Sequence, residues 1–205
     1  LPAKQMEAYM GRIQGKEAEI GWLPAMQLRW AVRSKATATG GVFRKHKSSK
    51  EILAPFDQAV LERVLAALQD DLAERFRAAG WQARTAAELG SDVPQLKTLK
   101  ANAELGVPVL KLDNTVNAQD FVVVALPGRA PVDTKAISNG MAIQRFLKGK
   151  QGLHASIVYE FAPGTVAETD SRMLGTEAGA GLWFNARADF IGAERGGWGN
   201  INTKP

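Results

Sequence analysis

The chain of 205 residues is 45% hydrophobic and 23% charged, and it contains no cysteine. These proportions are typical of a folded domain and exclude a collagen-like or mainly disordered chain. Without cysteine the chain cannot form disulfide bonds, cysteine-ligated zinc or iron–sulfur sites, or a cysteine nucleophile. We expect one globular domain over residues 1–205, with an N-terminal arm over 1–25 and a tail over 196–205 that is either held by Trp198 or mobile.

The net charge of +5 is concentrated in the first quarter of the chain. Residues 1–50 hold 10 Lys and Arg against 3 Asp and Glu, whereas residues 51–205 hold 16 against 18. Such an asymmetry is typical of proteins that bind an anionic partner, such as nucleic acid, lipid headgroups or an acidic protein surface. A solvated surface that keeps a protein in solution produces the same pattern.

The first predicted element is a strand over residues 26–38, where apolar and polar side chains alternate. A period of two places the two kinds on opposite faces of a sheet, which favours an antiparallel or edge position. The polar face carries three cations, and further cations follow in a loop over 42–51. Together they form the predicted basic binding site: Arg29, Arg33, Lys35, Arg44, Lys45 and Lys47.

A long amphipathic helix is predicted over residues 58–79, because apolar side chains recur there at three- and four-residue spacing. Asp57 is placed to cap its N-terminus, and Gly80 can take the left-handed conformation that ends a helix. Residues 81–85 alternate as a short strand would. This part of the chain is therefore a strand–helix–strand unit.

Three further elements are predicted in the middle of the chain. Residues 92–105 fit a second helix with Pro94 in its first turn, and 107–112 fit an edge strand. The run 121–126 is apolar throughout and rich in valine, which favours a central strand covered on both faces. At six residues it is also the longest apolar run, far short of the roughly 20 residues of a transmembrane helix.

In the last third of the chain, the first segment does not predict one kind of element, whereas the later segments alternate clearly between apolar and polar residues. Residues 129–152 fit either a short helix or a glycine-rich loop. Residues 153–161 and 181–191 alternate as two strands of a hairpin with a long connection. Trp183 and Trp198 are either exposed anchors for a partner or aromatics covered by another segment.

Motifs for phosphate, dinucleotide and metal binding are missing from the sequence. Residues 148–151 read Lys-Gly-Lys-Gln and lack the hydroxyl that a P-loop uses to hold magnesium. The glycines over 175–181 do not follow a strand and open a helix, as a dinucleotide fingerprint requires. No clustered histidines or aspartate-rich loop indicates zinc or calcium. We predict no cofactor and no metal.

Ser138 and His154 are the remaining candidates for catalysis. Ser138 lacks the glycine that a nucleophile elbow places two residues earlier. His154 shares the polar face of its strand with Glu160, but the two lie roughly 20 Å apart along an extended strand and cannot be direct partners. A lone strand histidine is usually a solvated or hydrogen-bonded surface residue, so we interpret His154 in that way.

The order strand, long helix ending in Ala-Ala-Gly-Trp at 78–81, short strand, helix, apolar strand resembles a group of small bacterial cell-envelope domains. The group includes the curli-secretion lipoprotein, the lipoprotein activators of penicillin-binding proteins and the amino-terminal domain of the Tol translocation protein. The resemblance covers about residues 26–126. It implies a non-enzymatic envelope protein that binds another protein or assembles with itself.

The sequence thus predicts an α/β or α+β domain with a mixed, largely antiparallel sheet of about five or six strands, covered on one face by the long helix and one or two short ones. The preferred function is protein binding or self-assembly in the periplasm or after secretion. The chain starts with Leu1, which fits either a removed signal or lipid-anchor segment or simple trimming. Binding of an anionic polymer or nucleic acid through residues 29–50 is the second hypothesis, and a hydrolase using His154 or Ser138 is the third.

Overall fold

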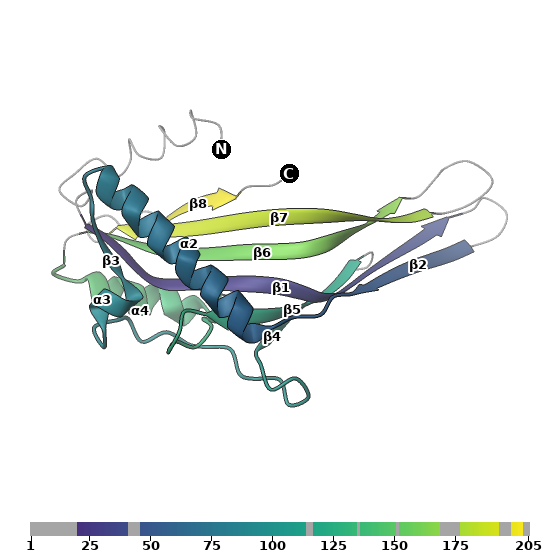
Figure 1. Ribbon diagram of the computed structural model, residues 1–205, viewed down its shortest axis with the longest axis horizontal. Helices are drawn as coiled ribbons and strands as arrows, with labels where there is room; N and C mark the ends of the chain where they lie inside the picture. The colour runs from purple at the N-terminus through teal and green to yellow at the C-terminus, as the bar shows by residue number, and fades with distance from the viewer. Residues whose placement is uncertain are drawn as a thin grey trace.

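A computed structural model describes residues 20–40, 46–113, 117–134, 136–150, 152–168, 177–192 and 198–202. These residues form one eight-stranded sheet with helices on both faces (Figure 1). The strands are β1 (Ile20–Gly40), β2 (His46–Leu53), β3 (Gln82–Thr85), β4 (Val109–Asp113), β5 (Asn117–Ala125), β6 (Leu153–Glu168), β7 (Glu177–Gly192) and β8 (Trp198–Asn202). The helices are α2 (Gln58–Ala78), α3 (Ala86–Leu89) and α4 (Ile137–Leu147).

The sheet is organised around the long strand β1. Six strands follow one another in the order β4-β5-β1-β6-β7-β8, while β3 pairs with the N-terminal end of β1 and β2 with its C-terminal end. The pairs β1–β6 and β1–β3 are parallel, and the other pairs are antiparallel. The predicted fold class is therefore confirmed: a mixed, largely antiparallel sheet with one long helix and short ones.

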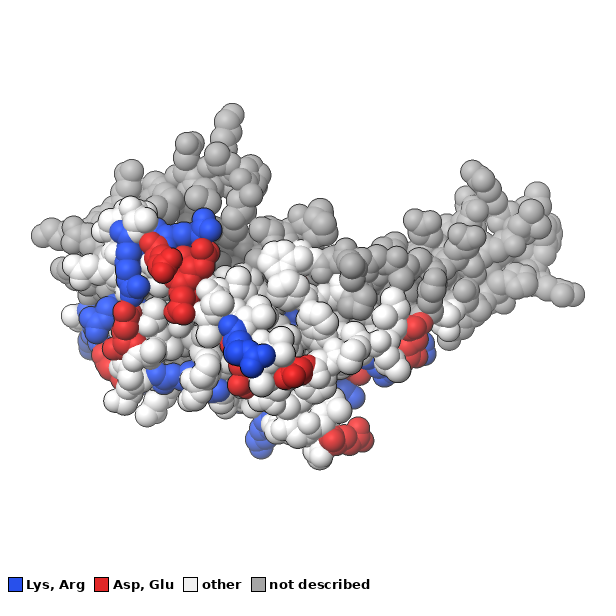
Figure 2. Space-filling view, viewed as in Figure 1, with Lys and Arg blue, Asp and Glu red and all other residues white. Residues whose placement is uncertain are grey.

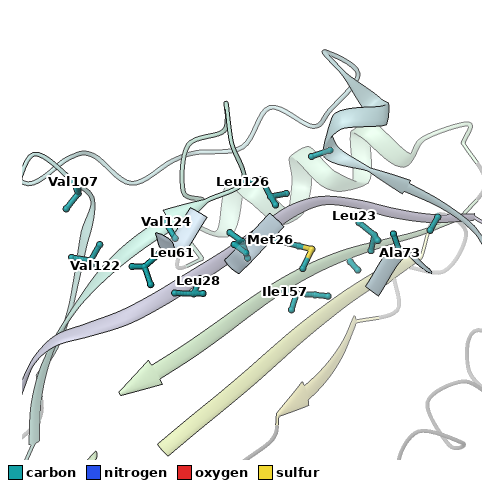
Figure 3. Close-up of a cluster of buried hydrophobic side chains, with 14 residues drawn as sticks. Leu23, Met26, Leu28, Leu61, Ala73, Val107, Val122, Val124, Leu126 and Ile157 are labelled. Atoms are coloured by element: carbon teal, nitrogen blue, oxygen red, sulfur yellow. The ribbon is translucent and has the colours of Figure 1, made fainter. Parts of the chain in front are cut away.

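Helix α2 covers one face of the sheet. Asp57 caps it as predicted, since its Oδ1 accepts a hydrogen bond from the backbone N–H of Val60 at 3.1 Å, and Gly80 follows the helix with φ 88°. Leu61 and Ala73 of the helix pack on apolar side chains of β1, β5 and β6 (Figure 3). Burying one leucine of this kind contributes about 1.5–3 kcal/mol. Because this layer contains more buried side chains than the other clusters, it forms the main core. Its buried members are Leu23, Met26, Leu28, Leu61, Leu65, Ala73, Ala83, Ala86, Val107, Val122, Val124, Leu126, Ala155 and Ile157.

The opposite face of the sheet is covered by α4 and the segment that leads to it. Ile143 and Leu147 of α4 form a second cluster with Trp22 of β1 and Leu89 of α3. The alternating side chains of β1 explain this arrangement, because Met26 and Leu28 face α2 whereas Gln27 bonds to the backbone of Val132 on the α4 side. We expected helices on one face only, and the helical reading of residues 129–152 provides the missing layer.

The predicted helix over 92–105 is wrong. This segment is extended and irregular, with isolated bridges from Thr98 to Val132 and from Ala101 to Pro108. Its helical spacing was misleading because the apolar side chains Val93 and Leu96 pack against the cluster around Trp22 instead. The helix after β3 is the short α3. Its N-terminus is capped by a capping box between Thr85 and Glu88.

The predicted strands are present and several are longer than expected. Phe121 to Ala125 of β5 and the following Leu126 are almost wholly buried, as the apolar run indicated. β6 and β7 pair from Leu153–Gly192 to Glu168–Glu177, so that part of the predicted connection is strand. Residues 198–202 of the tail form β8 along β7. Figure 1 shows β1, β2, β6 and β7 extending beyond the helices at one end.

In the described part of the chain, no helix combines the length and the hydropathy needed to cross a membrane.

Candidate functional site

Arg29, the first residue of the predicted basic site, is bonded within the fold. Its Nη1 donates to Oε2 of Glu160 on the neighbouring strand β6 at 2.9 Å, and its Nη2 donates to Oγ1 of Thr134 at 2.8 Å. The side chains of Arg29 and Glu160 are only 14% and 12% exposed. Because a carboxylate already compensates this guanidinium, Arg29 serves to hold β1, β6 and the segment before α4 together.

Arg33 lies on the other face of β1. A register shift between Ala31 and Arg33 inserts one residue opposite β5, which reverses the alternation of side chains from that point. The Nε of Arg33 lies 2.7 Å from Oε1 of Glu51, and its Nη1 lies 3.6 Å from Oδ2 of Asp120. These two carboxylates raise the pKa of Arg33. Arg29 and Arg33 therefore do not form one surface.

The rest of the predicted basic site is only partly described. Lys35 is half-buried and follows Arg33 on the same side of β1. Lys47 lies in β2 opposite Thr39, but its side chain is outside the description, and Arg44 and Lys45 lie outside the described residues altogether. The side chains of Trp183 and Trp198 also fall outside it. Binding through these cations stays a prediction.

His154 is not a surface residue, contrary to expectation. It is 0% exposed, and neither of its ring nitrogens has a hydrogen-bond partner among the described residues. It lies opposite Trp22 in the β1–β6 register, on the sheet face that α4 covers. Burial lowers the pKa of His154 from 6.5 to about 4, which keeps the ring neutral at pH 7. The alternation of side chains along β6 correctly predicted the sheet face on which His154 lies. It could not show that α4 covers this face.

Two groups considered for catalysis are used elsewhere or stand apart. Glu160, which shares the strand of His154, is engaged with Arg29. Ser138 is exposed on α4, and no hydrogen bond joins it to His154 within the described ranges. The described His, Asp and Glu residues include no group of three that could hold a metal ion.

A hollow of about 650 Å³ with a mainly apolar lining lies beside α4. Backbone and side-chain hydrogen bonds hold its walls in place. Buried Asn139 accepts from the N–H of Lys97 at 2.6 Å and donates to the carbonyls of Lys97 and Asp133 at 3.1 and 2.9 Å. The lining residues are Leu96, Val132, Asp133, Thr134, Ala136, Ile137, Asn139, Gly140, Met141, Ile143, Gln144, Arg145 and Ser156.

The rim of this hollow carries two large apolar side chains that the fold does not bury. Ile137 is 89% exposed and Met141 is 58% exposed, one helical turn apart. Arg145 continues the same side of α4, and Lys148 is the residue that directly follows the helix. Both are exposed, and within the described chain neither has an ion-pair partner. We call these four residues the α4 stripe. It is apolar in its first half and cationic in its second.

Sequence reasoning missed the α4 stripe although its spacing is visible in the sequence. Positions 137, 141, 145 and 148 are four, four and three residues apart, the separation of neighbours on one helix side. The glycines at 140 and 149 obscured the helix, and the buried set Asn139, Ile143 and Leu147 became recognisable only once the sheet was in place.

Comparison with protein-family models, with curated proteins and with solved structures found no match to this chain.

Proposed function

We propose that this chain is a non-catalytic cell-envelope protein that binds another protein or assembles with itself, and that the α4 stripe and its hollow are the contact surface. The exposure of Ile137 and Met141 beside the hollow carries this proposal. Adjacent exposed apolar side chains next to a concave apolar surface are typical of protein interaction sites.

The polar groups of the described chain support a binding role over catalysis. Arg29, Glu160 and Asn139 make hydrogen bonds that hold elements together, and His154 is buried as a neutral ring. A general base must reach the proton of a bound substrate, which the position of His154 prevents. These groups fit a scaffold that presents a surface.

An envelope location is supported by the order of elements. β1, α2, β3, α3 and β5 keep the order on which the resemblance to small envelope domains depends. β2 is added after β1 and β4 before β5, and the four-residue α3 stands in place of the longer helix expected there. We propose a periplasmic or secreted protein. Fractionation of cells that express the complete natural gene tests this location. Recovery in the cytoplasmic fraction would contradict it.

The second hypothesis is that the basic residues bind an anionic polymer. The structure leaves fewer unpaired cations for such binding than the sequence indicated. Arg29 and Arg33 already face carboxylates, so Lys35, Arg44, Lys45 and Lys47 would have to supply the affinity. Binding to heparin at several salt concentrations tests it. A steep decrease with salt that Lys45→Glu and Lys47→Glu abolish would favour this function over the one proposed.

Site-specific photo-cross-linking tests the proposed contact surface. A benzophenone amino acid at Met141 should give a discrete cross-linked species in cells that make the protein, and Ile137→Glu should remove it. The same probe at Leu105, which is 47% exposed outside α4, is the matched control and should give none. Equal cross-linking from both positions, or none from Met141, would overturn the proposal.

A further inference from the structure

Helix α2 carries a second exposed stripe on its outer side. Val60 and Val64 are 40% and 41% exposed, although both are apolar and lie one turn apart. Asp71 and Glu74 continue the same side of the helix and are exposed. Figure 2 shows acidic side chains, flanked by basic ones, over the C-terminal half of α2. We call these four residues the α2 stripe, which is apolar in its first half and anionic in its second.

The two stripes are complementary when the helices lie parallel. Val60 and Asp71 are eleven residues apart, as are Ile137 and Lys148, and eleven residues span about 16 Å of helix. In that alignment Val60 and Val64 lie opposite Ile137 and Met141, and Asp71 lies opposite Lys148. Arg145 and Glu74 each lie three residues, about 4.5 Å, from this ionic contact. One register therefore brings the apolar pairs and the opposite charges together.

The cations on α2 do not cancel this match. Arg75 pairs with Asp71 on the same helix at 2.8 Å, but both side chains are largely exposed, at 74% and 57%. An exposed pair of this kind is worth little and exchanges partners easily. Arg77, the other arginine of this half, pairs with Glu88 outside the helix at 2.6 Å. Asp70 and Glu74 are also exposed there, so the C-terminal half of the helix has three carboxylates against Arg75 and Arg77.

We propose that copies of this chain assemble head to tail, with the α4 stripe of one copy on the α2 stripe of the next. This contact is the self-assembly form of the function proposed above and rests on it. The two helices cover opposite faces of one sheet, so each copy keeps one free stripe after the first contact. A contact between two different surfaces repeats into a ring or an open row of subunits.

Charge reversal tests the pairing with two variants. Neither should associate alone, but they should associate when they are mixed. The α4-reversed variant carries Arg145→Glu and Lys148→Glu, and the α2-reversed variant carries Asp71→Lys and Glu74→Lys. Each has like charges on both stripes, so each should remain monomeric in sedimentation velocity at concentrations where the wild type associates. An equimolar mixture should associate again, because each acidic stripe then meets a basic one.

Controls separate this pairing from general effects of charge. Lys100→Glu with Lys111→Glu reverses two exposed cations outside both stripes and should associate like the wild type. All four stripe reversals in one chain should restore association without mixing. Near-ultraviolet circular dichroism confirms that each variant is folded.

The possible results distinguish this pairing from the broader proposal. A wild type that stays monomeric up to millimolar concentration, or association that stops at a closed dimer, would overturn head-to-tail assembly. If Ile137→Glu abolished association but the mixture did not restore it, the α4 surface would remain the contact site and the pairing with α2 would be wrong. If the Met141 cross-link also failed, the proposed function would fall as well.

Discussion

Asn139 of α4 and Lys97 of the preceding segment are joined by a reciprocal pair of hydrogen bonds between the side-chain amide of one and the backbone of the other, at 2.6 and 3.1 Å. The same amide reaches the carbonyl of Asp133. One buried side chain therefore fixes both segments that wall the hollow, and the position of the α4 stripe depends on it.

Replacing Asn139 with alanine should destabilise the protein. The change removes three hydrogen bonds and leaves backbone groups of Lys97 without partners, which costs about 2–4 kcal/mol of unfolding free energy. Urea denaturation measures the effect. Ser138→Ala, one residue earlier on the exposed side of the same helix, is the control and should stay within about 0.5 kcal/mol. Equal stability of both variants would show that the amide does not anchor α4.

His154 should make the stability depend on pH. Its folded pKa of about 4 lies below its ordinary value of 6.5, so the unfolded chain binds the proton more readily. This contribution is complete above pH 6.5 and is lost as the pH falls from 6.5 toward 4, by roughly 3 kcal/mol in total.

His154→Leu separates this contribution from that of the carboxylates. The variant keeps an apolar group of similar size opposite Trp22 but cannot bind a proton. Its unfolding free energy should decrease less than that of the wild type between pH 6.5 and 4, by about 3 kcal/mol. Parallel pH profiles for the two proteins would mean that the imidazole is not buried as described.

The Arg29–Glu160 pair should show strong coupling. Arg29→Met or Glu160→Gln alone leaves a poorly exposed charge without its partner and should cost about 3 kcal/mol. The double variant should be more stable than the sum of the two losses predicts, because no unpaired charge remains. A double-mutant cycle in urea measures this coupling. Additive effects would show that solvent screens the pair.

The sequence alone was sufficient to predict α2 and the apolar part of β5, because their patterns depend on local interactions. The α2 helix agrees with its predicted ends because Asp57 and Gly80 act locally, through one hydrogen bond and one backbone conformation. The apolar run of β5 likewise predicts burial on both faces, which depends little on what covers it.

Features that depend on distant segments could not be predicted. The spacing of Leu96 and Leu99 fits a helix, yet the backbone N–H of Leu99 donates to the carbonyl of Pro131, and the segment is irregular. The single-residue register shift after Ala31 separates Arg29 from Arg33, and alternation alone places them on one face. The burial of His154 depends on the cluster that α4 forms with Trp22.

The central claim, that the outer sides of α4 and α2 contact each other between copies, can be measured without any substitution. A dilution series of ¹H–¹⁵N spectra of the wild type should move the amide signals of Ile137, Met141 and Arg145 together with those of Val60, Val64 and Asp71, all with one apparent affinity. Signals that do not change with concentration, or changes confined to residues outside these two helices, would contradict it.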